Sequence, residues 1–293
     1  MINDPRPSYR AGGKIERKSG VKEKVLVLGS GFIASRLKEE LGFEICDRII
    51  RKFSDAETLV NEFKPNIIIN AAGYTGKNVD YCELDKENTL LANSFLPILL
   101  AEAALRNNIR LVHISSGCIY HYDYKQDSPI GEERVPDFFG LFYSRSKIYS
   151  EQPLSILASI YPILIVRIRI PLDNRPNPKN LLDKLINYKK VIDVPNSVTY
   201  IPDFVRALKH LIDIQATGLY NVVNNGGLRY PELLDIYRRH VPGFKYEIID
   251  YKKLKLVRTN LILSTEKLEK SGFRMPGIHE VLEKCVEDYL KFS

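Results

Sequence analysis

The hydrophobic positions of this 293-residue chain fall in short apolar runs that alternate with longer amphipathic segments. A short apolar run is typical of a strand buried on both faces of a parallel sheet, whereas an apolar residue at every third or fourth position is typical of a helix. Strands are expected over residues 24–28, 43–47, 66–70, 110–114, 162–170 and 218–223. Helices are expected after the first strand through Leu41, around residues 143–147, and over residues 55–63, 87–106, 180–190, 202–215, 231–240 and 278–291. This alternation predicts the α/β class with a doubly wound parallel sheet, the Rossmann architecture.

The first expected strand runs into a turn of the pattern Gly-x-Gly-x-x-Ala that opens the first helix. In a dinucleotide-binding turn the first glycine permits the tight bend, the second lets the backbone approach a pyrophosphate, and a small third residue lets helix and strand pack closely. The helix N-terminus supplies N–H donors to the anion. The pattern predicts an NAD(P) site with Gly29, Gly31, Phe32, Ile33 and Ala34 as cofactor residues. A glycine-rich turn of another α/β protein is the alternative.

An acid and a base both follow the second expected strand. An acidic residue there binds the ribose 2′-hydroxyl of NAD, whereas an arginine favours the 2′-phosphate of NADP. Asp47 and Arg48 are therefore both assigned to the cofactor site. Arg51 and Lys52 add positive charge close behind, which favours NADPH as the cofactor, with NADH as the alternative.

Small residues follow the third expected strand at Ala71, Ala72 and Gly73, where a flat cofactor could lie over them. Asn93 on the next expected helix and Pro171 after the strand over residues 162–170 are also assigned to the cofactor site. Open α/β sheets bind ligands beyond the carboxyl ends of their strands, where these turns are expected to meet.

A tyrosine and a lysine four positions apart, Tyr143 and Lys147, are expected on one face of a helix. A neighbouring ammonium stabilises phenolate and is expected to lower the pKa of Tyr143 toward the working range of an acid–base group. Ser116, after the strand over residues 110–114, could join these two residues in binding a carbonyl or alcohol group. A bare Tyr-x-x-x-Lys pair occurs often by chance, but the dinucleotide turn upstream favours the catalytic interpretation.

Charge and composition divide the chain into three parts. The first 24 residues hold seven Lys or Arg, three Asp or Glu and few apolar side chains, so residues 1–23 are expected to form a disordered basic extension. Residues 24–170 are expected to form the NAD(P)-binding Rossmann domain. Residues 171–293 are expected to form a smaller mixed α/β substrate-binding region, and the boundary is approximate because the chain crosses back and forth in such folds.

Length and composition also limit the class of protein. The chain is 44% hydrophobic and has no run of eighteen apolar residues, so a soluble cytoplasmic protein without a membrane segment is expected. The four cysteines and five histidines have no paired or metal-ligand spacing, so no metal is expected. The net charge of +7 suits an anionic substrate such as a nucleotide. Binding of nucleic acid is not expected, and a homodimer is left open.

Taken together, these motifs resemble those of extended short-chain dehydrogenases/reductases. The resemblance is narrower to the dTDP-4-dehydrorhamnose reductase branch, and within it to the C-terminal epimerase–reductase half of plant rhamnose synthases. It spans about residues 24–290 and is carried by segments in the family's order: Asn70–Glu83, Gly117–Tyr120, Phe142–Lys147, Arg167–Pro171, Asn177–Asn180 and Pro195–Thr199.

The resemblance implies an enzyme that takes UDP-4-keto-6-deoxy-glucose, epimerises C3 and C5, and reduces C4 with NADPH to give UDP-L-rhamnose. Tyr143 would donate a proton to O4, Ser116 would bond the same oxygen, and Lys147 would bind the nicotinamide ribose. The family's epimerisation pair, a cysteine and a lysine, falls on Cys118 and Lys184. A C4 ketone acidifies the neighbouring C–H groups, and a thiol and an amine could remove a proton on one face and deliver one on the other.

The same resemblance places Thr75, Ser116, Cys118 and Asn180 against the sugar nucleotide. Four of the residues assigned through the resemblance also have a purely structural alternative. Cys118 could be a small buried hydrophobe, and Lys184 could be an ordinary exposed lysine of an amphipathic helix. Asn180 could cap that helix, and Thr75 could stabilise a turn.

Two other functions are kept as alternatives. The chain could be a 4-ketoreductase only, with epimerisation left to a separate enzyme, or a reductase-like regulatory subunit without catalysis. The retained Ser116, Tyr143 and Lys147 argue against the regulatory subunit. A 4,6-dehydratase is set aside because that class places Asp-Glu where this chain has Gly117 and Cys118.

Overall fold

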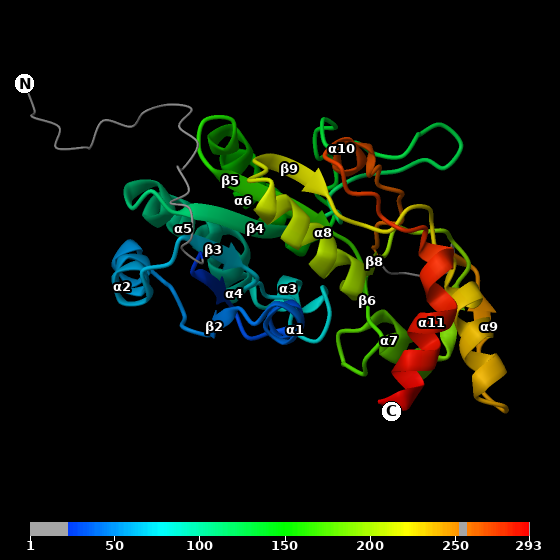
Figure 1. The fold of residues 1–293 in the computed structure, drawn as a ribbon. Coiled ribbons are helices and arrows are strands. Elements are labelled where there is room, and N and C mark those ends of the chain that lie inside the picture. The colour runs from blue at the N-terminus through cyan, green and yellow to red at the C-terminus, as the bar shows by residue number, and fades with distance from the viewer. Residues whose placement is uncertain (1–22, 252–256, 293) are drawn as a thin grey trace, which may run out of the picture.

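The computed structural model describes residues 23–251 and 257–292, and its centre is a six-stranded sheet (Figure 1). The strands lie in the order β2-β1-β3-β4-β5-β9, and every neighbouring pair is parallel. Their bounds are β1 Val25–Leu28, β2 Glu44–Cys46, β3 Ile67–Asn70, β4 Arg110–Ser116, β5 Ile163–Ile168 and β9 Gly218–Asn221. The predicted doubly wound sheet is confirmed, and its order reverses between β1 and β3, where such sheets bind ligands.

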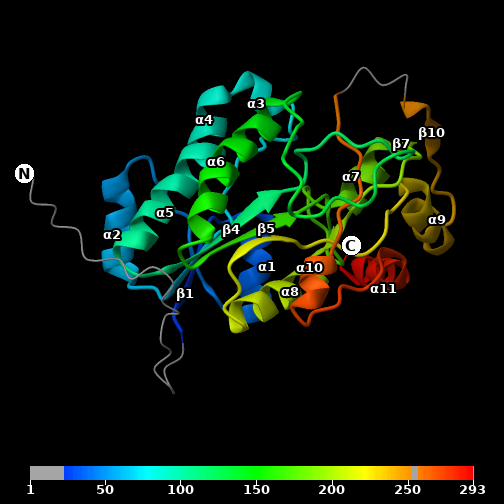
Figure 2. The same cartoon turned by 90° about the horizontal axis from the view of Figure 1, so that it is seen from above.

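Helices cover both faces of this sheet, as the view from above shows (Figure 2). One face carries α2, α5 and α6, and the other carries α1 and α8. Their bounds are α1 Phe32–Leu41, α2 Phe53–Phe63, α5 Leu96–Arg106, α6 Phe142–Ala158 and α8 Ile201–Asp213. Because successive side chains of a strand point to opposite faces, Leu26 and Leu28 enter the first core whereas Val27 enters the second. Burial on both faces explains why the strands are apolar at consecutive positions.

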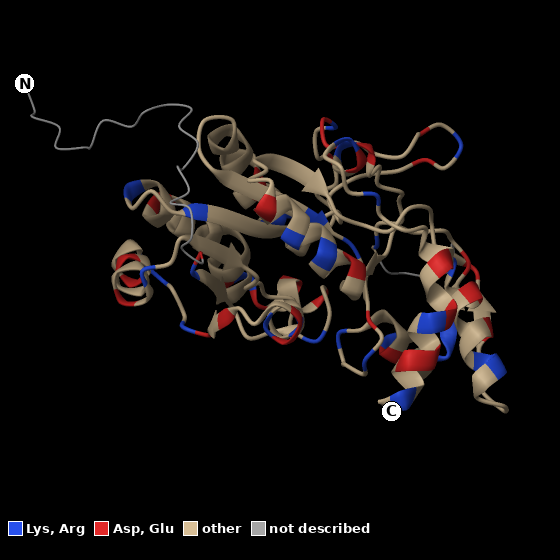
Figure 3. Ribbon diagram, in the orientation of Figure 1, with Lys and Arg blue, Asp and Glu red and all other residues tan. Residues whose placement is uncertain are grey.

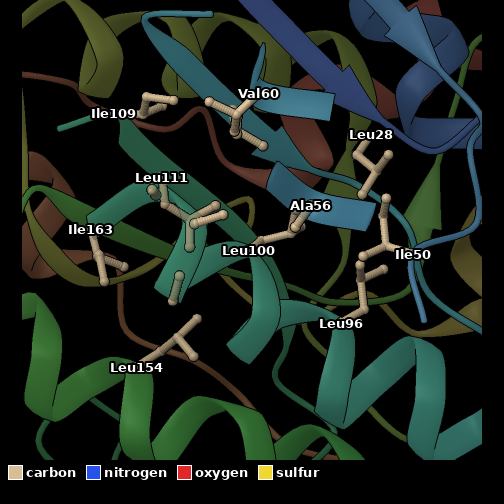
Figure 4. Close-up of a cluster of buried hydrophobic side chains, with 14 of the residues drawn as sticks. Leu28, Ile50, Ala56, Val60, Leu96, Leu100, Ile109, Leu111, Leu154 and Ile163 are labelled. Atoms are coloured by element: carbon tan, nitrogen blue, oxygen red, sulfur yellow. The ribbon is translucent and has the colours of Figure 1, made fainter. Parts of the chain in front are cut away.

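The core on the α2, α5 and α6 side is drawn in Figure 4. Leu100 of α5 and Leu111 of β4 are wholly buried there, together with Leu154 of α6 and Ala56 of α2. Burial of a leucine side chain stabilises the fold by about 1.5–3 kcal/mol relative to exposure. This face of the sheet therefore gives the turns at the strand ends a rigid base.

The helix predicted over residues 87–106 is continuous but has an irregular centre. α4 (Lys86–Leu90) passes through a π-helical turn, η1 (Leu91–Phe95), into α5. Such π turns are rare and often lie at functional sites, and this one carries Asn93. By length and composition alone, the span Lys86–Arg106 could cross a membrane. Half of its most apolar stretch is buried inside the protein, however, as in a core helix.

The C-terminal part adds a separate apolar core beside the sheet, on the right of Figure 1. It contains helices α7, α9 and α11 and two small parallel sheets, β6–β8 and β7–β10. The bounds are β6 Pro171–Leu172, α7 Leu181–Tyr188, β7 Lys190–Ile192, β8 Thr199–Tyr200, α9 Tyr230–His240, β10 Glu247–Ile249 and α11 Ile278–Lys291. In Figure 3 basic and acidic segments mix along α9 and α11, where Arg239 pairs with Glu283.

Several elements differ from the sequence prediction. The small strands β6, β7, β8 and β10 and the helices α3 (Tyr81–Leu84) and α10 (Glu266–Lys270) were not predicted, because elements this short show no clear hydrophobic period. β4 continues beyond residue 114 because it pairs with β5 as far as Ser116. β5 ends at Ile168, and Ile170 has a left-handed backbone with a φ of 37°.

The chain returns to the main sheet after residue 170, where the sequence placed its approximate boundary. α8 packs on the sheet through Phe204 and Leu208, and β9 pairs with β5. Residues 201–221 therefore belong to the Rossmann layers although they lie within the predicted C-terminal region. The basic extension predicted over residues 1–23 lies outside the described residues, apart from Glu23.

Candidate active site

The turn after β1 comes very close to the turn after β3. Gly29 has a φ of +112°, and a Cβ on it would lie 2.9 Å from the backbone nitrogen of Ala72, so the position requires glycine. Gly31 precedes α1, and a Cβ on it would meet no atom within 4 Å. The first turn of α1 has no acidic side chain, and its N–H groups have no partner within the helix. Open space beside such donors suits an anion.

The residues after Gly31 attach α1 to the sheet. Ala34 is wholly buried in the second core, and Phe32 and Ile33 pack at its edge. The turn thus combines the open backbone, the N–H donors and the small residue that a pyrophosphate site needs. These residues fit the dinucleotide that the sequence predicts.

The turn after β3 is held in place by Asn93. The amide oxygen of Asn93 accepts from the Tyr74 N–H at 2.8 Å, and its nitrogen donates to the Tyr74 carbonyl at 2.9 Å. A Cβ on Gly73 would lie 3.2 Å from Asn93 Oδ1 and 3.4 Å from Lys147 Nζ. The π turn therefore places a buried Asn93 where it clamps the Ala71–Gly73 turn beside Lys147.

The residues that follow β2 differ in their surroundings. Asp47 is exposed, whereas Arg48 donates to Glu62 Oε2 at 2.8 Å and lies over the ring of Phe63. The hydrogen bond to Glu62 raises the pKa of Arg48. Arg48 is thus engaged with α2. Arg51 is exposed, and within the described part of the chain its side chain has no hydrogen bond or ion pair, so it is available to a phosphate.

Ser116, Tyr143 and Lys147 meet beyond the carboxyl end of β4. Tyr143 and Lys147 lie one turn apart on α6, and Ser116 at the end of β4 interacts with the Tyr143 phenol. Ser116 Oγ also accepts from the Cys118 N–H at 3.2 Å. The Lys147 side chain is 5% exposed, and its ammonium makes no hydrogen bond within the described residues. The tertiary structure therefore joins Ser116 to Tyr143 and places Lys147 one turn along the same helix, beside the Gly73 turn.

Burial sets the charge states of the tyrosine and the lysine. It raises the pKa of Tyr143, the charge of Cys118 raises it further, and the hydrogen bond with Ser116 opposes both. The expectation that Lys147 lowers the pKa of Tyr143 is wrong in this structure, because burial dominates. The phenol is therefore protonated at neutral pH, which is the form that donates a proton. Burial also lowers the pKa of Lys147 to about 8, so its ammonium persists at pH 7.

Cys118 lies in the loop after β4 and is partly exposed, whereas the other three cysteines of the chain are buried. Arg169, which follows β5, donates to its sulfur at 3.1 Å and to the Gly117 carbonyl at 3.3 Å. Ser144 at the start of α6 donates to the Cys118 carbonyl at 2.5 Å. Contacts from β4, β5 and α6 thus hold Cys118, which remains partly exposed.

Lys184 on α7 is half-buried. Burial lowers the pKa of Lys184, and the charge of Lys179 lowers it further. Lys179 reaches the turn after β3, where it donates to Thr75 Oγ1 at 3.0 Å and to the Gly76 carbonyl. Two lysines and a threonine therefore form a basic side of the site. Within the described residues no hydrogen bond or ion pair joins Lys184 to Cys118, so the structure does not bring the predicted epimerisation pair into contact.

The side chain of Asn180 makes its hydrogen bonds with nearby backbone groups. It caps α7 by accepting from the Leu182 N–H at 3.2 Å, and its amide also bonds the backbone of Asp173 and Arg175. Because the side chain is fully buried, this geometry matches the capping alternative rather than a substrate contact. Pro171 opens β6, whose pairing with β8 begins the C-terminal region.

Sequence reasoning missed Arg169, Lys179 and Tyr230, which all face the site. Tyr230 begins α9 and is half-buried; burial raises its pKa, Arg169 lowers it, and Cys118 raises it. Arg169 lies in the segment Arg167–Pro171 that carried the family resemblance, but its partners come from positions 27 to 90 residues away. No local pattern predicts contacts over such distances.

One group of potential metal ligands lies away from this site. His240, Glu283 and Glu287 place ligand atoms within 4.8 Å of one another. All three are exposed, and Glu283 is already bonded to Arg239 and His240. The sequence predicted no metal, and exposed groups held in ion pairs do not by themselves form a metal site.

Residues 27–227 match the family described as RmlD substrate binding domain. The chain is 31% identical over 249 residues to the bifunctional dTDP-4-dehydrorhamnose 3,5-epimerase/dTDP-4-dehydrorhamnose reductase of Arabidopsis thaliana, across 80% of this chain and 82% of that protein. It is 32% identical over 238 residues to a trifunctional UDP-glucose 4,6-dehydratase/UDP-4-keto-6-deoxy-D-glucose 3,5-epimerase/UDP-4-keto-L-rhamnose-reductase of the same plant. That match covers 78% of this chain, which spans about a third (35%) of the trifunctional protein.

Solved structures share the fold along most of the chain. The UDP-rhamnose synthase of Acanthamoeba polyphaga mimivirus is 25% identical with a TM-score of 0.84, over 91% of this chain and 99% of that one. The dTDP-4-dehydrorhamnose reductase of Bacillus anthracis, solved in complex with NADP, is 22% identical with a TM-score of 0.78, over 93% of this chain and 100% of that one. The second likeness shows the fold alone.

Proposed function

The chain belongs to the RmlD substrate binding domain family, and from that premise we propose that it is an NADPH-dependent 4-ketoreductase of a nucleotide sugar that also epimerises C3 and C5. The proposed substrate is UDP-4-keto-6-deoxy-glucose and the proposed product is UDP-L-rhamnose. The observation that carries the proposal is the meeting of Ser116, Tyr143 and Lys147 with a partly exposed Cys118 at the carboxyl edge of the sheet. The names of the plant and viral relatives support a reaction of rhamnose synthesis. UDP is supported by the names of the trifunctional plant protein and the viral enzyme, whereas the bifunctional plant protein is named for dTDP sugars.

The reduction uses the groups on β4 and α6. NADPH, bound over the turns after β1 and β3, supplies the hydride that reaches C4. Lys147 binds the nicotinamide ribose, because its ammonium has no protein partner among the described residues and borders the Gly73 turn. Tyr143 donates its proton to O4, and Ser116 hydrogen-bonds the same oxygen and orients it.

The epimerisation uses the same oxygen as its electron sink. Cys118 takes a proton from a carbon next to the C4 ketone, and the enolate charge on O4 is stabilised by the Ser116 and Tyr143 hydroxyls. Lys184 delivers a proton on the other face of the sugar. Burial lowers the pKa of this lysine, which makes its ammonium a better proton donor near neutral pH.

The reductase-only function is the second candidate. It is favoured by the dTDP-4-dehydrorhamnose reductase of Aggregatibacter actinomycetemcomitans, which is 40% identical over 103 residues and whose name states reduction alone. In that case Cys118 would not exchange protons with the substrate.

One incubation separates the two candidates. The protein is mixed with UDP-4-keto-6-deoxy-glucose and NADPH in D2O, and the product is analysed by proton NMR. A 6-deoxyhexose of rhamnose configuration with deuterium at C3 and C5 is expected from the bifunctional enzyme. Consumption of NADPH without deuterium at either carbon would leave the reductase alone. The same assay with NADH measures the cofactor preference.

Variants of the proposed epimerisation pair complete the test. Without NADPH, Cys118→Ser should abolish deuterium incorporation, and Lys184→Met should abolish inversion of the carbon. Lys189→Gln, at the exposed end of α7, is the matched control and should exchange at the wild-type rate. Full exchange in Cys118→Ser would remove this cysteine from the mechanism.

A further inference from the structure

Arg169 is a buried cation without an anionic partner. Its side chain is 1% exposed. The guanidinium donates to Asn196 Oδ1 at 2.8 Å, to Thr259 Oγ1 at 3.2 Å, to the Thr259 and Gly117 carbonyls, and to Cys118 Sγ at 3.1 Å. No carboxylate within residues 23–251 and 257–292 lies at salt-bridge distance from it. A buried charge is costly unless a counter-charge compensates it.

The other buried arginines of the described chain have such compensation. Arg167, two positions earlier, pairs with the buried Glu151 through both carboxylate oxygens. Arg36 pairs with Asp173 at 3.0 Å. Arg110 donates to the Ile212 and Leu211 carbonyls at the C-terminal end of α8, where the helix dipole favours a cation. Within the part of the chain that the structure describes, Arg169 is therefore the exception, and Cys118 is its only partner that can become an anion.

Two tyrosines are electrostatically coupled to Cys118. Tyr143 from α6 and Tyr230 from α9 both respond to the charge of Cys118, which raises the pKa of each. Ser116 accepts from the Cys118 N–H and holds the loop. A negative sulfur thus faces one cation, Arg169, and two phenols that burial keeps protonated.

We propose that Arg169 is a positioning residue that holds the Cys118 sulfur in place and in its thiolate form. The guanidinium is itself fixed by Asn196 and Thr259, so that its Nη1 group points at the sulfur. Removing the charge would leave the sulfur as a thiol, which cannot accept a proton from carbon.

The consequence for catalysis rests on the proposed epimerase function. The thiolate forms an S–H bond with a proton from the carbon next to the ketone, the C–H bond breaks, and its electron pair moves into the enolate. Arg169 stays charged throughout and touches neither substrate nor cofactor in this step. No oxidant or reductant is needed.

Alkylation tests the proposal without relying on enzyme activity. The full chain is treated with iodoacetamide from pH 5.5 to 9.5, and modification of the Cys118 peptide is followed by mass spectrometry. The other cysteines are buried, which keeps the background low. The rate at each pH is compared between wild type and the variants below, because the thiolate is the form that reacts.

Two substitutions and a control assign the effect to the charge. Arg169→Gln keeps a planar donor but removes the charge, and should slow alkylation at pH 7 by about tenfold or more, because the reactive thiolate loses its counter-charge. Arg169→Lys should stay near wild type. Arg106→Gln removes the charge of an exposed arginine at the end of α5 and is the matched control, which should also match wild type. An unchanged profile in Arg169→Gln contradicts the proposal.

Deuterium exchange separates this proposal from the proposed function. If wild type exchanges deuterium at C3 and C5, Arg169→Gln should lose that exchange at least tenfold while Arg169→Lys retains most of it. If wild type shows no exchange but Arg169→Gln shifts the alkylation profile, the epimerase function fails and the role of Arg169 stands. If exchange occurs and the alkylation profile does not respond, only the role of Arg169 fails.

Discussion

At the scale of single residues, burial decides what Tyr143 and Lys147 can do. A protonated phenol beside a charged ammonium is ready to donate a proton when a ketone is reduced, and the two pKa shifts keep both groups in these forms at pH 7. The reverse reaction, oxidation of an alcohol, would need the phenolate and is disfavoured by the same burial.

The first prediction concerns the proton donor. Tyr143→Phe should lower kcat for 4-ketoreduction by about 10²–10⁴-fold, the usual contribution of a general acid, while the melting temperature stays near that of wild type. Tyr149→Phe, on an exposed face of the same helix, is the matched control. A Tyr143→Phe enzyme within tenfold of wild type would show that another group donates the proton.

The second prediction concerns the lysine. Because burial lowers the pKa of Lys147 to about 8, its ammonium is lost as pH rises through that value. The kcat/KM for NADPH should therefore fall above about pH 8 in wild type, measured over pH 6 to 10. In Lys147→Met, activity should be low at every pH and the fall in kcat/KM above pH 8 should disappear. A fall in wild-type kcat/KM only near pH 10 would indicate an ordinary, exposed lysine at the site.

At the scale of elements, two turns and a π helix build the cofactor edge. The turn after β1 and the turn after β3 nearly touch at Gly29 and Ala72, and η1 places Asn93 under the second turn. Asn93 also donates to Ser146 of α6 at 3.2 Å, and Ser94 donates to the Ser146 carbonyl at 2.8 Å. The irregular helix thereby fixes both the turn and the helix that carries the catalytic pair.

The third prediction compares the two glycines of the first turn. Gly29→Ala combines a positive φ with a close backbone contact, so it should lower the free energy of unfolding by more than about 1 kcal/mol. Gly31→Ala meets no protein atom and should leave stability unchanged. It should nevertheless weaken NADPH binding by about tenfold, or 1.4 kcal/mol, because the methyl group enters the space left for the pyrophosphate. Denaturant unfolding measures the change in stability, and fluorescence titration measures the affinity for NADPH. Equal NADPH affinity in wild type and Gly31→Ala would show that the pyrophosphate does not bind beside Gly31.

At the scale of the whole molecule, one buried and one partly exposed ion pair join the Rossmann layers to the C-terminal part. Arg36 of α1 pairs with Asp173, which follows β6 and is wholly buried. Arg258 of the C-terminal part donates to both carboxylate oxygens of Asp80, at 2.7 and 2.6 Å. Both contacts connect segments far apart in the sequence and hold the two sides of the site together.

The fourth prediction concerns the pH dependence of stability. Burial raises the pKa of Asp173 to about 6, although Arg36 opposes the shift. A folded pKa above the unfolded value means that the folded state binds the proton more tightly, so this group adds stability as pH falls from about 7 to 4. Relative to Asp173→Asn, the unfolding free energy of wild type should rise by on the order of 2–3 kcal/mol over that range. Urea unfolding at several pH values measures it, and parallel curves for the two proteins would contradict the shift.

Much of the fold and part of the site followed from local sequence. The parallel strands, their helices and the glycine turn have periodic or motif-like patterns, and the enzyme class suggested by Tyr143, Lys147 and Ser116 agrees with the nucleotide-sugar relatives. The small strands of the C-terminal part were missed because two or three residues carry no period. Arg169 and Lys179 were missed because their partners lie on other elements.

By itself, the sequence determined the order of strands and helices and the chemical groups at the strand ends, because backbone preference and apolar period act between near neighbours in the chain. Only the tertiary structure decided which charges these groups carry and which partners they meet. Burial, not Lys147, sets the pKa of Tyr143. Likewise, a buried arginine from beyond β5 reaches the Cys118 sulfur only when β4 and β5 pair. Desolvation and contacts across the sheet exist only after the chain has folded.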